Sequence, residues 1–570
     1  MGNERALLPQ MTQNTARPEP LAIAVDDTEE SEMSEKAETF LLRKATGLVR
    51  EAGFWDTVVY NMLPAAPGVV LAFYVFWLPG TFPGSSIPWA MVAACLATLF
   101  VSSSFGLLAL AMPRTAGDYV ATSRILHPAV GLASSLLLSF SSILSVGYWT
   151  LAWTTAAFTP ALSVVGSTTG NLGLIDLAGK LATPPWNFII GVVAIAAMSY
   201  MMALGMRKLM RFQNILYIIA MVGLVVMAVV LISTPRETYI ARFNEFANPI
   251  TQQADTYHFY LEEAAKGGMV TAPVSFSGTL PIFAAIMTMG MWSWWSVAFA
   301  GEVKGTGTRR HWYAMLVANV VNYAIMIVLV LLFYRTVGED FVGAVNYVSA
   351  VAPDTYGLPM APMLPLLVSI IPKGAFVAWL IAITFIAWTP LVHFIQMVQP
   401  IRALFAWSFD RLLPAKVAEV DERTHAPLVA IIIVAVIGVG FFAWSVWAAS
   451  FFTALVLAGL AGAGVMIIMG ITAIAFPYVN RQLYQSSPGR IDVLGVPLCV
   501  IAGVVTVAAE VVIAYFYISD SRLGLSNPGA AVALTVGILV VGAIYYFIAK
   551  AIRAKQGIEI DYIFKSVPPE

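Results

Sequence analysis

Long apolar segments, bounded by polar residues, recur along the whole chain. Each holds about 20 mostly apolar residues, the length at which an α-helix crosses the hydrocarbon core of a bilayer. The third and eighth segments are longer than a bilayer needs, which predicts that they are tilted. The pattern predicts an all-α membrane protein with twelve transmembrane helices, at about 55–79, 86–111, 129–160, 186–206, 213–233, 278–301, 312–336, 373–405, 427–446, 452–477, 493–518 and 530–551.

The composition supports this interpretation, because 59% of the 570 residues are hydrophobic and only 11% are charged. A soluble protein of this size has too little interior for so much apolar surface, so we expect the lipid bilayer to surround the chain. The net charge of -1 gives no basic surface for nucleic acid, and we expect no nucleic-acid partner. Cys95 and Cys499 lie in apolar segments and are predicted to be buried thiols, with no disulfide or metal site.

Polar sequence flanks the apolar segments and sets the expected domain boundaries. Residues 1–53 include an acidic stretch from Asp26 to Glu38 and lack the apolar core of a secretory signal peptide. We expect a disordered cytoplasmic tail there, with a regulatory or docking tail as the alternative. Residues 54–552 form the predicted transmembrane domain, and 553–570 form a second cytoplasmic tail.

The distribution of positive charge predicts the orientation. If the N-terminus is cytoplasmic, 24 of the 31 Lys and Arg residues lie on the cytoplasmic side, which predicts that both termini are inside. The long outer connections 234–277 and 337–372 contain Pro, Gly and aromatic residues, and are predicted to fold as caps. Two interpretations of these connections remain: they are plain connecting loops, or they form an extracellular gate. The seven residues on the outer side are Lys180, Arg236, Arg242, Lys266, Arg335, Lys373 and Arg522.

The first apolar segment is interrupted in its middle by Asn61-Met-Leu-Pro-Ala-Ala-Pro-Gly68. Unpaired backbone groups are costly in hydrocarbon, so a break at this depth is expected to face a cavity or bind a ligand. Pro67 suits the first turn of a new helix, which would leave the N–H groups of Gly68, Val69 and Val70 free to attract an anion. A simple proline kink is the alternative.

The sixth segment holds a second candidate break, at Gly290. Transporters of this size often consist of two inverted halves, each of which opens with a discontinuous helix. The sixth segment is the partner of the first in such a repeat. Thr288 and Trp292 lie beside Gly290, and a Met- and Trp-rich core helix is the alternative to a binding site.

Three stretches resemble a known family. They are similar to segments of amino acid–polyamine–organocation (APC) permeases. The loop after the second helix of that family resembles AMPRTAGDYVATSRILHPAVG at 111–131, and the end of its sixth helix resembles AGEVKG at 300–305. The segment that closes its eighth helix resembles IRALFAWSFDRLLPAKVAEVDERTHAP at 401–427. The resemblance covers about 50–550.

This resemblance implies a LeuT-like fold: a five-plus-five inverted repeat, at about 54–233 and 278–477, followed by two extra helices at about 493–551. It implies alternating access around a substrate site between the first and sixth helices. In the family the first-helix break is usually glycine-rich, whereas this chain has prolines there. The expected substrate-binding residues are Asn61, Pro64, Pro67, Gly68, Val69, Val70, Met287, Thr288, Gly290 and Trp292.

Charged residues in the cytoplasmic motifs suggest an inner gate of ion pairs. The candidates are Arg114, Arg124, Glu302, Arg402, Asp410 and Arg411. The alternative is that the basic ones only set the topology, because surface ion pairs contribute little by themselves.

Ionisable groups within membrane helices are candidates for function because their burial is costly. His393 in the eighth helix is a possible proton carrier, with a hydrogen-bonded structural histidine as the alternative. Thr389, and less favourably Thr384, offer hydroxyls for a sodium ion beside the first-helix break. Sodium is slightly preferred. In some proton-coupled members of the family that the chain resembles, a lysine of the fifth helix takes the place of the sodium ion, and the predicted fifth helix at 213–233 contains no lysine. Glu510 is expected to be structural or oligomeric.

These observations favour a secondary active transporter of neutral amino acids, apolar or aromatic, in the cell membrane. No phosphate loop, zinc spacing or catalytic triad is present in the sequence, so we expect neither an enzyme nor a cofactor other than Na⁺ or H⁺. The expected partner is the small-molecule substrate. Alternatives are an exchanger or transporter of other organic amines or nucleobases, and a ligand sensor on the same fold that does not transport.

Overall fold

The computed structural model describes residues 47–568, apart from 306, 359–360, 373–374, 449 and 525–526. Nothing is described of the side chains at 156, 167–168, 375, 389 and 452–458. The predicted N-terminal tail therefore lies almost entirely outside the described residues. All described residues belong to one structural unit.

Twelve spans in the described part of the chain are long and apolar enough to cross a membrane, as predicted. The first consists of α2 (Phe54–Met62) and α3 (Pro67–Thr81), and the sixth of α13 (Phe276–Gly290) and the 3₁₀ turn η2 (Trp295–Ala298). The third consists of α6 (Pro128–Ala152), the π-helical turn η1 (Trp153–Phe158) and α7 (Thr159–Thr169). The others are α4 (Ile87–Ala111), α9 (Trp186–Ala203), α10 (Met206–Ser233), α14 (Arg309–Val337), α18 (Ala375–Phe409), α19 (Leu428–Trp447), α20 (Ser450–Val479), α22 (Leu498–Ser519) and α23 (Pro528–Lys555).

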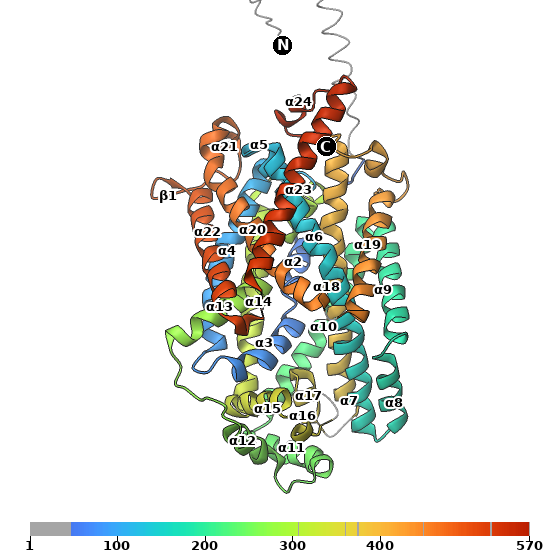
Figure 1. Ribbon diagram of the computed structural model, residues 1–570, viewed down its shortest axis with the longest axis vertical. Coiled ribbons are helices and arrows are strands. Elements are labelled where there is room, and N and C mark those ends of the chain that lie inside the picture. Colours follow the sequence, from blue (N-terminus) through green and yellow to red (C-terminus); the bar gives the residue numbers. More distant parts are fainter. Residues whose placement is uncertain are drawn as a thin grey trace, which may run out of the picture. The chain divides into compact units, whose positions relative to one another are not determined.

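Short elements gather at the two ends of the spans (Figure 1). The end that carries α5 (Gly117–Ile125), α21 (Arg481–Ser486) and α24 (Asp561–Phe564) is called the terminal end here. The opposite end is called the cap end, and the connections that were predicted to fold as caps, 234–277 and 337–372, contain helices. These are α11 (Arg236–Thr251), α12 (Thr256–Lys266), α15 (Glu339–Val351), α16 (Pro353–Tyr356) and α17 (Leu364–Ser369). The cap end also carries α8 (Leu172–Leu181), which lies between the third and fourth spans.

The remaining elements connect spans. They are the 3₁₀ turns η3 (Ala300–Glu302), η4 (Ala415–Ala418) and η5 (Ser521–Leu523), and an antiparallel pair, β1 (Asp492–Val493) with β2 (Val496–Pro497). This small hairpin was not predicted, and it delays the start of the eleventh span to Leu498. The predicted C-terminal tail is partly helical, because α23 continues to Lys555 and α24 follows.

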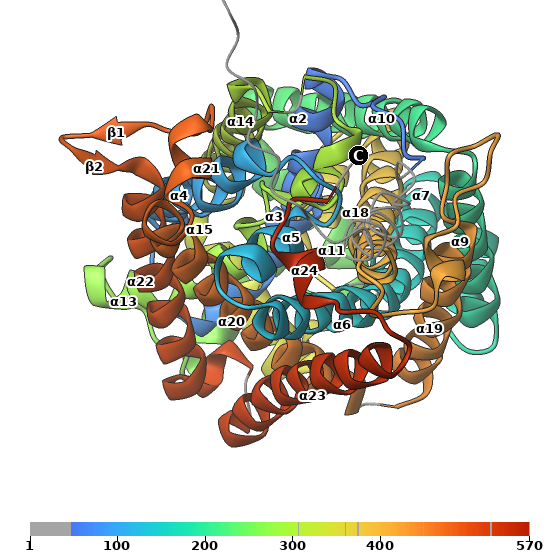
Figure 2. The ribbon, with the colours of Figure 1, turned by 90° about the horizontal axis from the view of Figure 1, so that it is seen from above.

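The first, third, sixth and eighth spans are the most buried and form the centre of the bundle, while α9, α10, α19, α22 and α23 are more exposed. Figure 2 shows α22, α23 and α19 at the periphery and α3 inside. The exposed faces are apolar: Val222 is 50% exposed and Ile548 is 51% exposed. Such side chains suit contact with lipid. The buried central spans position the candidate site.

Candidate functional site

The predicted break in the first span is present. α2 ends at Met62, α3 begins at Pro67, and Ala66 between them has a positive φ of 28°. The proline fits the first position of α3, where a backbone N–H is not needed. The Met62 carbonyl, which the break frees from helical pairing, accepts a hydrogen bond from Asn322 Nδ2 on α14 at 3.0 Å.

Of the three backbone N–H groups that were expected to be free, the one of Val70 is hydrogen-bonded. Val70 N donates to the Ala66 carbonyl at 3.0 Å, because Ala66 already accepts the first helical hydrogen bond of α3. In the described part of the chain, the N–H groups of Gly68 and Val69 have no hydrogen-bond partner. Two backbone donors, and not three, therefore remain for an anion.

Trp388 of α18 is a functional candidate that the sequence did not reveal. Its indole lies so close to Gly68 that a Cβ there would be 2.9 Å from Trp388 Nε1. The ring is fully buried and its N–H has no partner among the described residues. A leucine at Gly68 would have to displace this ring, so that substitution cannot isolate the role of the backbone donors.

The sixth span is also broken, as predicted. α13 ends at Gly290, Met291 N closes its last turn on the Met287 carbonyl at 2.9 Å, and the span resumes as a 3₁₀ turn at Trp295. A Cβ at Gly290 would be 2.3 Å from the hydroxyl oxygen of Tyr323 on α14. Only glycine allows this approach, which explains the residue at the break.

A buried polar cluster joins the two broken spans. Ser296 N donates to Asn61 Oδ1 at 2.9 Å, and Asn61 Nδ2 donates to Ser296 Oγ at 3.0 Å. Ser296 Oγ also lies 2.9 Å from His311 Nε2 on α14. The side chain of His311 is buried in this cluster. Asn61 holds the spans together, so its amide is already engaged.

Most sixth-span candidates face other helices. Thr288 Oγ1 donates to the Ala284 carbonyl at 2.8 Å and interacts with Tyr517 of α22. Trp292 donates from Nε1 to the Thr288 carbonyl at 2.7 Å, and its ring lies against Gly462 of α20. The fully buried Met287 accepts a weak hydrogen bond from Thr98 of α4. The expected substrate-binding residues Met287, Thr288 and Trp292 are therefore packed against other helices, whereas Pro64 and Pro67 do lie in the break.

The ion-coupling candidates do not converge on the first-span break. Thr384 donates to the Leu380 carbonyl at 3.0 Å and its hydroxyl fills the space beside Gly223 of α10. His393 Nδ1 lies 3.0 Å from Thr150 Oγ1, and the side chain lines a cavity with Trp153 and α9. The side chain of Thr389 is outside the described parts, so sodium at Thr389 stays a prediction.

Two buried ion pairs lie at the terminal end. Arg402 Nε lies 2.7 Å from Glu302 Oε1, and Arg402 Nη2 donates to Oε2 at 2.9 Å. Arg124 Nη2 lies 2.7 Å from Asp410 Oδ2, which also accepts a hydrogen bond from the Tyr119 hydroxyl at 2.9 Å. All four charged side chains are at most 9% exposed, so these are not surface pairs.

Two gate candidates have other roles. Arg114 Nε donates to the Pro568 carbonyl, which fixes the C-terminal segment against the loop before α5. Arg411 has a positive φ of 63° and offers its carbonyl to Arg553 Nε at 2.7 Å. The buried ion pairs that the structure does show among the gate candidates are Glu302 with Arg402 and Asp410 with Arg124.

Backbone contacts also join several elements at the terminal end. Ala52, just before α2, pairs with Val303 after the sixth span, and its N–H donates to the Glu302 carbonyl at 3.1 Å. Ala116 N, before α5, donates to the Ala298 carbonyl at 2.8 Å. The segment before the first span, the loop after the second span and the sixth span are therefore in direct backbone contact at the terminal end.

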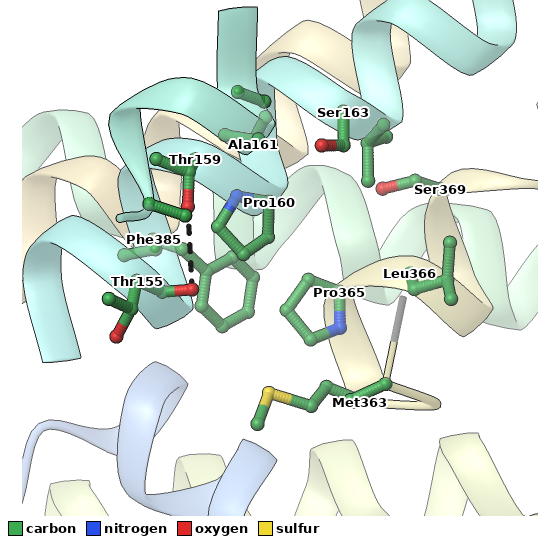
Figure 3. A pocket seen from close by; sticks show the side chains of 17 residues that line it. Thr155, Thr159, Pro160, Ala161, Ser163, Met363, Pro365, Leu366, Ser369 and Phe385 are labelled. Carbon is green, nitrogen blue, oxygen red and sulfur yellow. Dashed lines mark hydrogen bonds between the residues drawn. The ribbon is translucent and has the colours of Figure 1, made fainter. Parts of the chain in front are cut away.

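A pocket of ≈ 310 Å³ opens at the cap end, between α7, α8, α17 and α18 (Figure 3). Hydroxyls of Thr155, Ser163 and Ser369 lie among apolar side chains such as Phe385 and Met363. The π-helical turn η1 carries Thr155 to this pocket, and such turns are frequent at functional sites. A small adjoining cavity shares Ala157, Met363, Pro365 and Phe385 with the pocket and is also lined by Val69, Ala72 and Phe73 of α3.

A bundle of twelve apolar spans, with two broken spans joined at its centre, is the architecture of a membrane-embedded secondary transporter. The family model described as "Amino acid permease" matches residues 57–547, and the chain belongs to this family. It is a multi-pass membrane protein, and the family implies a transport function. No curated protein matches the chain.

Proposed function

We propose that the protein is a secondary active transporter that moves neutral amino acids, apolar or aromatic, across the cell membrane by alternating access. The observation that carries the proposal is the asymmetry around the joined breaks. Two buried ion pairs lie at the terminal end, while a pocket at the cap end adjoins a cavity lined by Val69, two residues after the start of α3.

The donors at the first break suit a carboxylate. The N–H groups of Gly68 and Val69 lie in the first turn of α3, where the helix dipole favours negative charge. The unpartnered indole N–H of Trp388 lies against the same turn. We infer that these three donors bind the substrate carboxylate, which requires the indole to move outward when the substrate enters.

The carboxylates near the broken spans argue against a cationic substrate, which needs a buried counter-charge. Asp56 accepts hydrogen bonds from Gly53 N at 2.9 Å and from Asn214 Nδ2 at 2.6 Å, at the start of α2. Glu302 is paired with Arg402. Neither is available to a cationic substrate side chain, which favours a substrate with a neutral side chain.

The excess of Lys and Arg on the terminal side supports a cytoplasmic location for that end, with both termini inside. The pocket at the cap end is then the outer entrance. In this proposal, the conformation of the site is one that is closed to the cytoplasm.

The test is counterflow in proteoliposomes loaded with unlabelled leucine or phenylalanine, with labelled amino acid outside. We expect transient accumulation of label, competition by neutral amino acids, and no competition by spermidine or arginine. Empty liposomes and liposomes loaded with no amino acid are the controls. Transport of spermidine or a nucleobase, with none of neutral amino acids, contradicts the substrate assignment.

The same preparation separates the transporter from a sensor. Binding of an amino acid, measured as a thermal shift, without counterflow would support the sensor. Replacement of sodium by choline at fixed pH, with and without an imposed proton gradient, then identifies the coupling ion.

A further inference from the structure

Glu510 is a carboxyl buried in the middle of a membrane span. It lies twelve residues after the start of α22, which is about 18 Å along the helix, near the midplane of a bilayer. Its side chain is 0% exposed, so it is not available to an oligomer partner. In the described part of the chain, neither of its carboxylate oxygens has a hydrogen-bond partner.

The face of α22 that carries Glu510 is packed tightly against neighbouring helices. A Cβ at Gly503 would be 2.5 Å from the Gly470 carbonyl oxygen, so α22 and α20 are in backbone contact. Thr506 Oγ1 lies 3.0 Å from Ser104 Oγ on α4. Glu510 follows Thr506 by one turn on the same face and therefore points into the interior between these helices.

No charged side chain of the helices packed against α22 compensates this carboxyl. The helices α4, α13 and α20, which pack against α22, contain no Asp, Glu, Lys, Arg or His. Their other ionisable side chains are Cys95 and Tyr478, and α22 itself adds Cys499, Tyr515 and Tyr517. At the end of α22, Arg522 is bound to Asp520 at 2.6 Å. A lone carboxyl without a cation in such surroundings is held in its neutral form, with a proton bound.

The same face also contacts the sixth span near its break. Tyr517, two turns after Glu510, interacts with Thr288, which lies two residues before Gly290. A movement of α13 at its break therefore changes the packing of the α22 face. This contact provides a route by which the state of the substrate site affects the access of water to Glu510.

We propose that Glu510 carries the proton that is coupled to amino acid transport, an assignment that rests on the proposed function. The carboxylate takes a proton from the outer solution as an O–H group, remains neutral while buried, and releases that proton to the cytoplasm. The transmembrane proton gradient supplies the driving force, and no other reactant is needed. Glu510 thus couples transport without contacting the amino acid.

The test compares Glu510→Gln with the parent protein in proteoliposomes, with the membrane potential clamped. Glutamine has the shape of a protonated glutamic acid but cannot release a proton. We expect the parent to accumulate labelled amino acid when the outside is acidic. We expect Glu510→Gln to keep counterflow and to lose this accumulation, and Glu510→Asp to regain part of it. Glu339→Gln, an exposed carboxylate on α15, is the matched control and should accumulate like the parent.

Infrared difference spectra provide a readout that does not need transport. A carbonyl band of a protonated carboxylic acid should be present in the parent and absent in Glu510→Gln, and thermal unfolding checks that the variant is folded. Absence of this band difference overturns the inference, as does full gradient-driven accumulation by a folded Glu510→Gln. Loss of accumulation in His393→Ala alone would place the proton on His393. Failure of the parent in counterflow would instead refute the proposed function.

Discussion

At the scale of single residues, the indole of Trp388 permits a sharp test of carboxylate binding. Trp388→Phe keeps an aromatic ring against Gly68 but removes the donor that has no partner among the described residues. A hydrogen bond to a charged group contributes about 1.5–3 kcal/mol, so we expect amino acid binding to weaken by about 10-fold or more. Binding is measured by calorimetry or by thermal shift over a range of concentrations.

Trp407→Phe is the matched control for this prediction. Trp407 Nε1 donates to Ser135 Oγ at 3.2 Å, away from the first-span break, so its loss should leave the affinity unchanged. Unchanged affinity in Trp388→Phe would remove the indole from the substrate site.

A second prediction at the residue scale concerns Asp118 on α5. Burial raises the pKa of this carboxyl from 3.8 to about 6. Below about pH 3 the group is protonated in both the folded and unfolded states. Between about pH 3 and 7 the folded state binds more protons, so the free energy of unfolding falls as the pH rises, by about 3 kcal/mol in total. Asp118→Asn should remove this loss.

The measurement is the melting temperature in detergent from pH 4 to 7. The advantage of Asp118→Asn over the parent should grow across this range and then level off. Asp354→Asn, an exposed carboxyl on α16, should show no such trend. A constant difference between Asp118→Asn and the parent would contradict the assigned titration.

Sequence patterns predicted the residues at the breaks better than their partners. Pro67 and Gly290 mark their breaks because proline and glycine limit or permit backbone conformations locally. The roles of Trp388 and His311 were missed because they depend on contacts between different spans, which a sequence does not display. Asn61 and Ser296, for example, are 235 residues apart. Thr288 and Trp292 were assigned to the site because they lie near the middle of a membrane span. Their side chains face α22 and α20.

At the scale of elements, hydrophobic patterning predicted all twelve spans, because lipid imposes a length that a sequence displays directly. It did not predict the π-helical turn in the third span or the hairpin before the eleventh. Both depend on packing against neighbouring elements, and no periodic pattern of apolar residues in the sequence marks them. The fifth span begins at Met206, earlier than predicted, because Arg207, Lys208 and Arg211 continue the helix beyond its apolar part.

The ion pair between η3 and α18 gives a prediction at this scale. Removal of one partner from a buried pair leaves an uncompensated charge and costs about 3–5 kcal/mol, whereas replacement of both by apolar residues is often neutral. We expect Arg402→Met to lower the melting temperature strongly and to loosen the terminal end. The double variant Glu302→Met with Arg402→Met should recover most of the stability.

The four proteins of this double-mutant cycle are compared by thermal unfolding and by counterflow. Recovery of stability without recovery of transport indicates that the pair acts as a gate as well as a structural contact. Additive losses in the double variant would show that the two side chains do not act as a pair.

At the scale of the whole molecule, buried ion pairs at one end and a pocket at the other predict which surfaces water reaches. Ser163 lines the pocket at the cap end, and Arg423 lies in the loop before α19 at the other end. With the proposed orientation, a cysteine in place of Ser163 should react with a membrane-impermeant thiol reagent added to intact cells. A cysteine in place of Arg423 should react only after the membrane is permeabilised.

The parent protein is the blank for this experiment, because its own thiols are half-buried at Cys95 and buried at Cys499. Alternating access adds a second expectation. A transported amino acid should slow the modification of Ser163→Cys, since the occluded and cytoplasm-open states close the cap-end pocket, whereas a non-substrate should not. Labelling of Arg423→Cys from outside would invert the proposed orientation. A rate at Ser163→Cys that transported substrates leave unchanged would mean that this pocket stays open throughout the cycle and is not the outer entrance.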